Sequence, residues 1–271
     1  MMKARVFLCV ALVVSLLVGC GPSAGKTNTG QPELIRIVAT VTPHAEVLEY
    51  IKPDLIARGV EIQIIDAPDY NMPNRALAAN EADANYFQHV PYLTRQIEDF
   101  GYEIESLVGV HIEPMGFYSR RASSLDELGD GAVISIPNDP SNGARALVLL
   151  HNNGLIELDD PTNVQLSVLN IVSNPKNIRF HEIDAAMLSR TLEDVDGSVI
   201  NSNFAMEAGF VPTRDAIVME SPYNNPNVNL VAVRIGDAEL PKFQILKEVI
   251  TSDRVRQFLL DRYEGAVVPA F

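Results

Sequence analysis

The sequence predicts an α/β protein, because short strand-like segments alternate with helical segments along most of its length. The strand-like segments at 34–40 and 60–66 are rich in Ile and Val, and each precedes a helical pattern. The chain has 271 residues, 47% of them hydrophobic, which suits one large domain or two lobes. Since this alternation favours parallel strand pairing, we expect largely parallel sheets.

Helix starts and strands can be placed in the first half of the chain. Thr42 is a good N-cap and Pro43 suits the first helical position, so a helix is expected from there to Arg58. Pro53 should kink or break this helix, because proline lacks a backbone donor. The other predicted elements of this half are a strand at 60–66, a helical start within 74–84 and an extended segment at 101–113.

The second half continues the alternation of strands and helices. Ser124 and Glu127 form the pattern of a capping box and predict a short helix. Two long extended stretches, near 109–117 and 222–232, are candidates for hinge strands between two lobes. The remaining predicted elements are a strand at 131–137, a strand, turn and helix at 197–210, a strand at 228–234 and helices between 240 and 263.

The N-terminus has the pattern of an export signal. Two basic residues precede an apolar run at 6–18 that is short for a membrane span. The run ends in Leu-Val-Gly-Cys, which resembles the lipobox of bacterial lipoproteins, where cleavage precedes the lipidated Cys; an ordinary signal peptide with an incidental Cys is the alternative. We expect a signal peptide at 1–19, lipidation of Cys20 and a flexible tether, so that 20–33 link the membrane to the body.

Charge and cysteine content exclude several classes of function. The formal net charge is −14, from 35 acidic and 21 basic residues, and no basic stripe indicates a nucleic-acid surface. The two cysteines are Cys9, inside the predicted signal peptide, and Cys20, so the mature chain is expected to lack disulfides and cysteine chemistry. No second apolar stretch is long enough to cross a bilayer, which predicts a protein anchored at the membrane rather than spanning it.

Residues 136–147, Ile-Pro-Asn-Asp-Pro-Ser-Asn-Gly-Ala-Arg-Ala-Leu, predict a turn followed by the start of a helix. Either Asp139 or Ser141 can cap this helix, and its free backbone N–H groups would form an anion site. Arg145 opposes the helix dipole there, which makes sense if an anion lies between the guanidinium and the helix. Alternatively, Arg145 reaches solvent or pairs with an acidic neighbour.

Ring side chains form a second candidate constellation. Tyr70 lies in a Pro- and Asn-rich loop after a strand, where α/β folds place binding loops. Four more rings fall within seven residues, either as core packing or as a wall for an apolar or thioether group; they are Tyr86, Phe87, His89 and Tyr92.

Asparagines form a third group, because an amide head can both donate and accept hydrogen bonds. Asn201 and Asn203 follow a buried-looking strand, and Asn229 lies inside a strand pattern, where Asn is depleted. Asn224 and Asn225 stand beside prolines and are better explained as turn residues.

Signals for an enzyme are poor. The chain lacks a Gly-x-Ser-x-Gly motif, a P-loop, a His-Glu-x-x-His motif and a dinucleotide fingerprint. Its five His residues are widely spread, and His-Ile-Glu at 111–113 only loosely resembles a zinc-deaminase signature, with no Cys pair after it. We therefore expect no catalytic residues, no metal site and no cofactor.

Taken in order, these segments resemble the NlpA/MetQ-type lipoproteins, the methionine-binding components of bacterial ABC importers. The resemblance covers the whole chain, from the lipobox to the C-terminal helix. The segments that carry it are PHAEVLEYIKP (43–53), DANYFQH (83–89), HIEPMGFYS (111–119), IPNDPSNGARAL (136–147), NPKNI (174–178), SVINSNFAMEAG (198–209) and VNLVAVR (228–234).

The resemblance implies a two-lobed periplasmic-binding-protein fold of the type II kind, with hinge strands and a ligand cleft between the lobes. We place lobe 1 at 34–112 plus 230–271 and lobe 2 at 113–229. By the same resemblance, Arg145 would hold the ligand carboxylate, and Asn201 and Asn229 would bind the amino-acid head group. The implied side-chain pocket is lined by Tyr70, Phe87, His89 and Tyr92, with Asn142 and Asn203 as secondary candidates.

The implied function is that of a lipid-anchored, extracytoplasmic protein that captures L-methionine or a close analogue and delivers it to a permease with its ATPase. Alternatives are another amino acid, a methionine derivative or a dipeptide as ligand and, more distantly, an adhesin, a scaffold or a hydrolase. One departure from the family pattern follows Ser-Pro-Tyr at 221–223, where Asn-Asn-Pro-Asn at 224–227 precedes Val228 and Asn229. An insertion or a shifted register there changes the local loop without removing Asn229.

Overall fold

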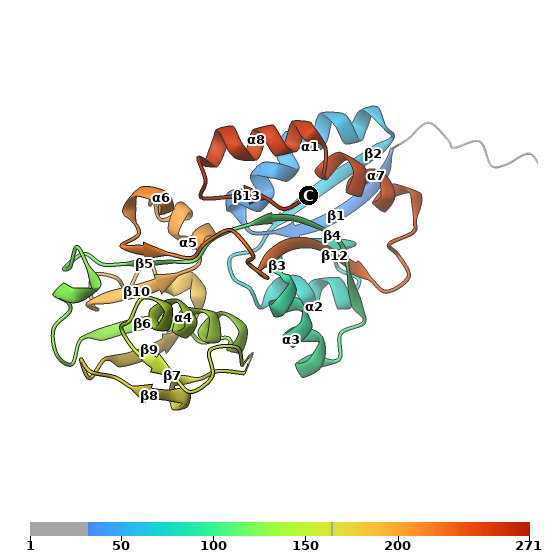
Figure 1. The fold of residues 1–271 in the computed structure, drawn as a ribbon. Helices are drawn as coiled ribbons and strands as arrows, with labels where there is room; N and C mark the ends of the chain where they lie inside the picture. The colour runs from blue at the N-terminus through green and yellow to red at the C-terminus, as the bar shows by residue number, and fades with distance from the viewer. Residues whose placement is uncertain (1–31, 164) are drawn as a thin grey trace, which may run out of the picture. The chain divides into compact units, whose positions relative to one another are not determined.

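Two mixed β-sheets, each flanked by helices, organise the protein (Figure 1). The computed structural model describes residues 32–163 and 165–271, which belong to one compact unit. The predicted signal peptide at 1–19, the lipidation site Cys20 and nearly all of the tether lie outside these residues. The predicted two-lobed α/β fold is confirmed, since each sheet carries its own hydrophobic core.

The first sheet has six strands in the order β13-β4-β12-β3-β1-β2. β1 pairs in parallel with β2 and β3, whereas β12 is antiparallel to both β3 and β4, and β13 is antiparallel to β4. The strands are β1 (Glu33–Ala39), β2 (Val60–Asp66), β3 (Ala84–His89), β4 (Ile104–Ile112), β12 (Val228–Arg234) and β13 (Val268–Pro269).

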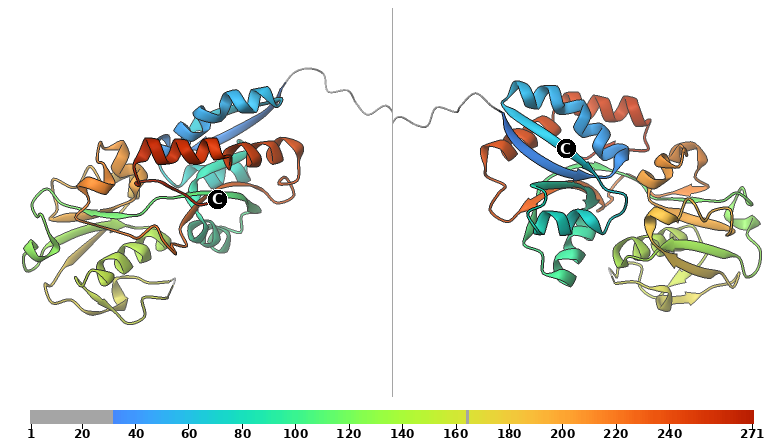
Figure 2. Two further views of the ribbon diagram at one scale, coloured as in Figure 1. Left: turned by 45° about the horizontal axis from the view of Figure 1, so that its top comes forward. Right: turned by 180° about the vertical axis from the view of Figure 1, so that it is seen from behind.

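Helices cover both faces of this sheet because successive strand residues point to opposite faces. In β12, Val231 and Val233 pack in the core that includes α1, α7 and α8, whereas Leu230 and Ala232 pack with α2 and α3 on the other face (Figures 1 and 2). These helices are α1 (Glu46–Ala57), α2 (Met72–Ala78), α3 (Val90–Phe100), α7 (Pro241–Ile250) and α8 (Asp253–Tyr263).

The second sheet has five strands in the order β11-β5-β10-β6-β9. Its core is built by α4, whose Ala146 and Leu150 pack in the same cluster as Ile134 and Ile136 of β6. The strands are β5 (Gly116–Tyr118), β6 (Val133–Pro137), β9 (Arg179–Ile183), β10 (Gly197–Ile200) and β11 (Val218–Met219). The helices are α4 (Pro140–Asn152), α5 (Ser202–Glu207) and α6 (Pro212–Asp215), and β7 (Glu157–Leu158) pairs with β8 (Ile171–Ser173) beside them.

The expectation of largely parallel sheets is wrong, because both sheets are mixed. The chain leaves the first sheet at 113–115 and returns to it at 220–227. Because the two crossings run in opposite directions, the strands that flank them, β4 with β12 and β5 with β11, pair antiparallel. The chain thus changes sheets within both predicted hinge stretches, while the lobe boundaries given above stay a prediction.

The predicted start of the first helix is confirmed only in part: Thr42 has the extended backbone of an N-cap and helical residues follow it, but its side chain caps no backbone amide. Thr42 has an extended backbone (φ −113°, ψ 129°), a single π-type turn spans Val41–Ala45, and α1 begins only at Glu46. The Thr42 hydroxyl donates to the Glu46 carboxylate instead of capping a backbone amide. Pro53 does not break α1, which continues to Ala57 because its apolar face is buried in the core.

The predicted capping box is also wrong. Ser124 makes no capping hydrogen bond, and only a 3-10 turn, Leu125–Glu127, follows it. Glu127 instead accepts from the backbone N–H of Ser123 at 2.7 Å. The other 3-10 turns are Val168–Asn170 and Ala185–Met187. Across residues 32–163 and 165–271, none of the helices combines the length and the apolarity that crossing a membrane requires.

Candidate binding pocket

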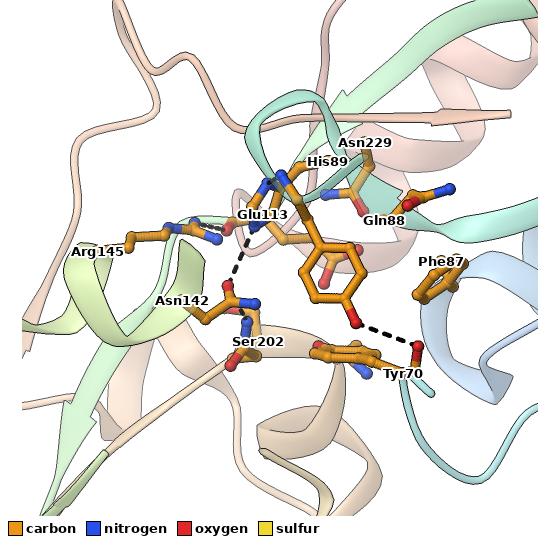
Figure 3. A pocket seen from close by; sticks show the side chains of 12 residues that line it. Tyr70, Phe87, Gln88, His89, Glu113, Asn142, Arg145, Ser202 and Asn229 are labelled. Carbon is orange, nitrogen blue, oxygen red and sulfur yellow. Dashed lines mark hydrogen bonds between the residues drawn. The ribbon is translucent and has the colours of Figure 1, made fainter. Parts of the chain in front are cut away.

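Strand ends from both sheets meet around one buried pocket (Figure 3). Its walls come from the loop after β2, from β3 and α3, from the residue after β4, from α4, from the junction of β10 and α5, and from β12. The space not filled by atoms there is about 320 Å³, with open solvent at its mouth included. The lining side chains are Tyr70, Phe87, Gln88, His89, Tyr92, Glu113, Asn142, Arg145, Asn201, Ser202, Asn203 and Asn229.

All nine side chains that were predicted to contact a ligand line this pocket, although their positions run from 70 to 229 in the chain. The structure therefore brings the candidates together, while their contacts with a ligand stay a prediction. Sequence reasoning missed Gln88, Glu113 and Ser202, which line the pocket as well. The predicted lipidation site, Cys20, lies outside the described residues.

Strand register explains why two of the predicted residues meet. β12 lies between β3 and β4, and Asn229 is the register partner of His89 on one side and of His111 on the other. Register shifts next to Asn229 interrupt the regular ladder on both sides. Polar side chains of three neighbouring strands therefore lie in one row near the pocket.

Three aromatic rings form an apolar wall of the pocket. The ring of Tyr70 lies with its centroid 5.9 Å from that of Phe87 and 5.8 Å from that of Tyr92, at tilted or edge-on angles. The Tyr92 hydroxyl donates to the Tyr70 carbonyl at 3.2 Å, and the Tyr70 hydroxyl donates to Asn203 Oδ1 at 2.6 Å. Because Tyr70 follows β2 and Asn203 lies in α5, this last bond joins the two lobes.

A chain of side-chain hydrogen bonds crosses the pocket through Asn142. His89 accepts the backbone N–H of Tyr92 at Nδ1 (3.2 Å), so its Nε2 donates to Asn142 Oδ1 at 3.0 Å. Burial, with the charge of Arg145 nearby, lowers the pKa of His89 to about 3, which keeps the ring neutral. Asn142 Oδ1 also accepts from Asn201 Nδ2 at 2.9 Å, so the donors and acceptors of this chain are fixed.

Arg145 is buried and forms an ion pair within the protein. Its Nε and Nη2 donate to the two carboxylate oxygens of Glu220 at 2.7 and 2.6 Å, and Nη2 also donates to the Glu113 carbonyl at 2.7 Å. Burial alone would raise the pKa of Glu220, but the Arg145 charge outweighs it and lowers that pKa. Of the alternatives for Arg145, pairing with an acidic neighbour is therefore realised, by a partner 75 residues away.

The start of α4 is not an open anion site. Asp139 is the N-cap, and its Oδ1 accepts the backbone N–H of Asn142 at 2.9 Å. Both Asp139 oxygens also accept from Asn142 Nδ2, at 3.1 and 3.0 Å. Arg145 lies in the second turn of the helix rather than the first. The anion at this helix start is thus the chain's own carboxylate.

Glu113 and two histidines form a buried cluster behind the pocket. His111 Nε2 lies 2.7 Å and His44 Nε2 3.3 Å from Glu113 Oε1, and these donor atoms lie within 4.8 Å of one another. The combination of residues could hold a metal ion, but the 2.7 Å contact has the length of a hydrogen bond. No sequence motif indicates this cluster, although His-Ile-Glu at 111–113 belongs to one of the segments that carry the family resemblance.

A wider groove opens on the other side of the Arg145–Glu220 pair. It lies between α3 and α4 and is bordered by residues 161–163 and 165 and by residues from 219 to 227. The loop residues at 224–227 reach this pair, because Asn225 Nδ2 donates to Glu220 at 3.2 Å and Asn227 Nδ2 donates to Asn225 at 2.8 Å. Asn225 thus has a role beyond turn formation, as it helps to hold the partner of Arg145.

A polar and aromatic pocket between two α/β lobes is the arrangement of a protein that encloses a small molecule. The chain belongs to the NlpA lipoprotein family, which it matches over residues 35–271. It is 38% identical to the methionine-binding lipoprotein MetQ of Bacillus subtilis over 98% of each chain. It is 35% identical to the D-methionine-binding lipoprotein MetQ of Escherichia coli strain K12, again over 98% of each chain.

Solved structures support the same relationship. A nutrient-binding protein from Burkholderia cenocepacia bound to methionine is 39% identical, with a TM-score of 0.84 over 88% of this chain and 100% of that one. A periplasmic substrate-binding protein of an ABC transporter from Coxiella burnetii is 42% identical, with a TM-score of 0.83 over 87% of this chain and 100% of that one. The family resemblance of the sequence is therefore confirmed.

Proposed function

We propose that this chain is a solute-binding protein that captures methionine in the pocket and has no catalytic step. The observation that carries the proposal is a pair of buried polar atoms with no hydrogen-bond partner among the described residues, Asn201 Oδ1 and Asn203 Nδ2. Leaving such an atom unpaired costs about 1–3 kcal/mol. An amino-acid head group supplies the missing donor to Asn201 and the missing acceptor to Asn203.

Asn201 is informative because of its place in the fold. It stands at the N-cap position of α5, where an Asn side chain ordinarily accepts a backbone N–H, yet it makes no such bond. Its amide instead points its nitrogen at Asn142 and leaves its oxygen unpaired. This residue gives up a stabilising cap, which supports a role in binding.

The two ends of the ligand follow from the remaining side chains. Glu220 engages Nε and Nη2 of Arg145, which leaves Nη1 for the ligand carboxylate. Asn229 contributes to the head-group site from the start of β12. The aromatic wall receives the thioether, since sulfur packs favourably against ring edges. Methionine in the names of the relatives, and in the Burkholderia complex, supports this choice of side chain.

Capture proceeds by opening and closing of the lobes. The bonds from Tyr70 to Asn203 and from His89 to Asn142 join side chains of the two lobes across the pocket. Entry of a ligand breaks them, and closure remakes them around it, so that the ligand selects the closed state. Closure also removes water from the charged head group and strengthens its contacts.

Membrane attachment and delivery complete the proposal. Lipidation of Cys20 would anchor the protein on the extracytoplasmic side, and residues 21–33 would form the tether. The partner is an ABC permease with its ATPase, in agreement with the ABC-transporter relative from Coxiella.

Calorimetric titration of the ligand-free, purified chain tests the ligand. We expect saturable binding of L-methionine and a rise of the melting temperature that grows with methionine concentration. D-Methionine, leucine, glutamate and methionine-containing dipeptides complete the panel. If methionine gives no signal and another member of the panel does, the proposed ligand is wrong; if none binds, the proposed function is wrong.

A further inference from the structure

The Glu113 carboxylate is a buried group of the pocket with several hydrogen-bond donors around it. It follows the last residue of β4, its side chain is 7% exposed, and it lines the pocket. One of its oxygens faces the imidazoles of His44 and His111, and the backbone N–H of Asn203 also favours its ionised form. A carboxylate in such a place must have its charge balanced, or it destabilises the protein.

His111 presents an N–H group to Glu113 rather than a positive charge. Burial lowers the pKa of His44 to about 4 and that of His111 to about 3, so both rings are neutral at neutral pH. The Tyr86 hydroxyl lies 2.5 Å from His111 Nδ1, and the Thr40 hydroxyl lies 2.7 Å from His44 Nδ1. When these hydroxyls donate to Nδ1, each ring carries its single hydrogen on Nε2; that of His111 points to Glu113 Oε1 at 2.7 Å, and that of His44 points to Asn229 Oδ1 at 3.0 Å.

The charge of Glu113 has no cationic partner of its own among the described residues. Arg145 attracts it, but Nε and Nη2 of that guanidinium are held by Glu220, and the only atom of Glu113 to which Nη2 donates is the backbone carbonyl oxygen. Glu207, the other charged side chain near Glu113, is acidic and repels it. Burial correspondingly raises the pKa of Glu113. The pocket therefore contains an anion, the Glu113 carboxylate, that accepts hydrogen bonds but has no positively charged group bonded to it among the described residues.

We propose that Glu113 is the counter-ion of the ligand's protonated α-amine and that His111 is a positioning residue that orients it for this contact. The inference rests on the proposed function, since it presumes a free amino acid in the pocket. Asn201 Oδ1, the unpaired acceptor of the same pocket, is the second partner of the ammonium group. The neutral imidazole of His111 orients Glu113 without cancelling its charge, so the site requires a cationic amine.

The amine requirement is tested by two ligands and one isosteric variant. The ligands are L-methionine and 4-(methylsulfanyl)butanoate, which is methionine without its amine, and the variant is Glu113→Gln. In the wild-type protein we expect methionine to bind at least about tenfold more tightly than the analogue. In Glu113→Gln the ratio of the methionine affinity to the analogue affinity should fall toward one. Methionine then loses the counter-ion of its amine, whereas the analogue, which has no amine, loses only the repulsion between two carboxylates. An unchanged ratio in the variant overturns the proposal.

The positioning role of His111 is tested by substitutions of Tyr86 and of His111 itself. Neither side chain lines the pocket, so neither contacts the ligand directly. Tyr86→Phe removes the hydroxyl that fixes the tautomer of His111, and we expect it to lower the ratio of the two affinities several-fold. His111→Leu should lower the ratio further, whereas His111→Gln retains a side-chain N–H and should restore part of it. If all three variants weaken the binding of both ligands equally, His111 has a structural role only and its positioning role is refuted.

The outcomes separate this inference from the proposed function. Failure of the wild-type protein to bind methionine contradicts the function. Tight binding of both methionine and the analogue contradicts the inference alone, because the pocket then recognises the thioether acid without its amine. Far-ultraviolet circular dichroism of each variant identifies any that do not fold, and Glu113→Gln, which preserves shape and removes a buried charge, carries the decisive comparison.

Discussion

Arg145 shows how one residue can serve both stability and binding. Its side chain is 7% exposed and that of Glu220 is 14% exposed, so the pair is largely removed from water. Two parallel hydrogen bonds of 2.6–2.7 Å hold the guanidinium plane in place. A cation fixed in this way can meet a ligand carboxylate without first losing side-chain freedom.

We predict that Arg145→Met lowers the free energy of unfolding of the ligand-free protein by about 3–5 kcal/mol, because it leaves the buried Glu220 carboxylate without a counter-ion. Urea-induced unfolding measures this change. The double variant Arg145→Met/Glu220→Gln removes the uncompensated charge and should regain most of the loss, while methionine binding stays weak. A double variant as unstable as the single one would show that the loss comes from packing rather than charge.

At the scale of elements, the first turn of α4 connects helix formation to the pocket. Asp139 caps the helix through the backbone of Asn142 and, with the same carboxylate, holds the Asn142 side chain. These hydrogen bonds direct Asn142 Oδ1 toward His89 and Asn201. His89 belongs to one lobe and Asn201 to the other. A local rule of helix capping thus determines the orientation of a side chain that lines the pocket.

Substitutions of Asp139 should separate these two roles. Asp139→Ala removes the cap and should lower the free energy of unfolding by about 1 kcal/mol. Asp139→Ser retains a capping oxygen and should restore that stability, but one hydroxyl cannot hold both the backbone and the side chain of Asn142. We therefore expect methionine affinity to fall in both variants, measured by calorimetry. Wild-type affinity in Asp139→Ser would mean that the cap alone orients Asn142.

Features that depend on residues close together in the chain could be predicted from the sequence, whereas contacts between residues far apart in the chain could not. β2 occupies the predicted residues 60–66, because alternating Val and Ile signal a strand within a few residues. The nine candidate residues, most of them implied by the family resemblance, line one pocket, while their contacts with a ligand stay a prediction; Asn229 stands out locally as an Asn inside a strand. Local patterns and family motifs therefore suffice for most elements, but they leave out Gln88, Glu113 and Ser202 of the lining.

Contacts between distant segments were beyond sequence reasoning. Glu220 pairs with Arg145 across 75 residues, and no spacing in the sequence indicates this partner. The histidines around Glu113 come from two further segments, and the placement of His111 depends on β12 lying between β3 and β4. The mixed pairing of both sheets was equally hard to predict. The direction of a strand depends on whether it flanks the crossing at 113–115 or the returning crossing at 220–227, and the sequence does not show which of these strands become neighbours.

At the scale of the whole molecule, buried imidazoles should dominate the response of stability to mild acid. His44, His89 and His111 are at most 5% exposed, and burial lowers their pKa values to about 4, 3 and 3. In the unfolded chain each returns to about 6.5. Between these values the unfolded state binds more protons than the folded state, so stability falls as pH is lowered. Burial raises the pKa values of the Glu113, Asp139 and Glu207 carboxyls, and these groups act in the opposite direction because they bind protons more readily in the folded state.

We therefore predict that the free energy of unfolding decreases as the pH is lowered from 7 to 5, with a net uptake of protons on unfolding. Each buried imidazole contributes about 1.4 kcal/mol per pH unit once the pH lies below 6.5. Urea unfolding at several pH values in this range gives the slope. His44→Gln should reduce the slope by about one proton, whereas His181→Gln, which removes an exposed imidazole on β9, is the matched control and should leave it unchanged. A free energy of unfolding that stays constant or rises toward pH 5 would contradict the neutral, buried state of these rings, and with it the hydrogen-bond directions assigned around Glu113.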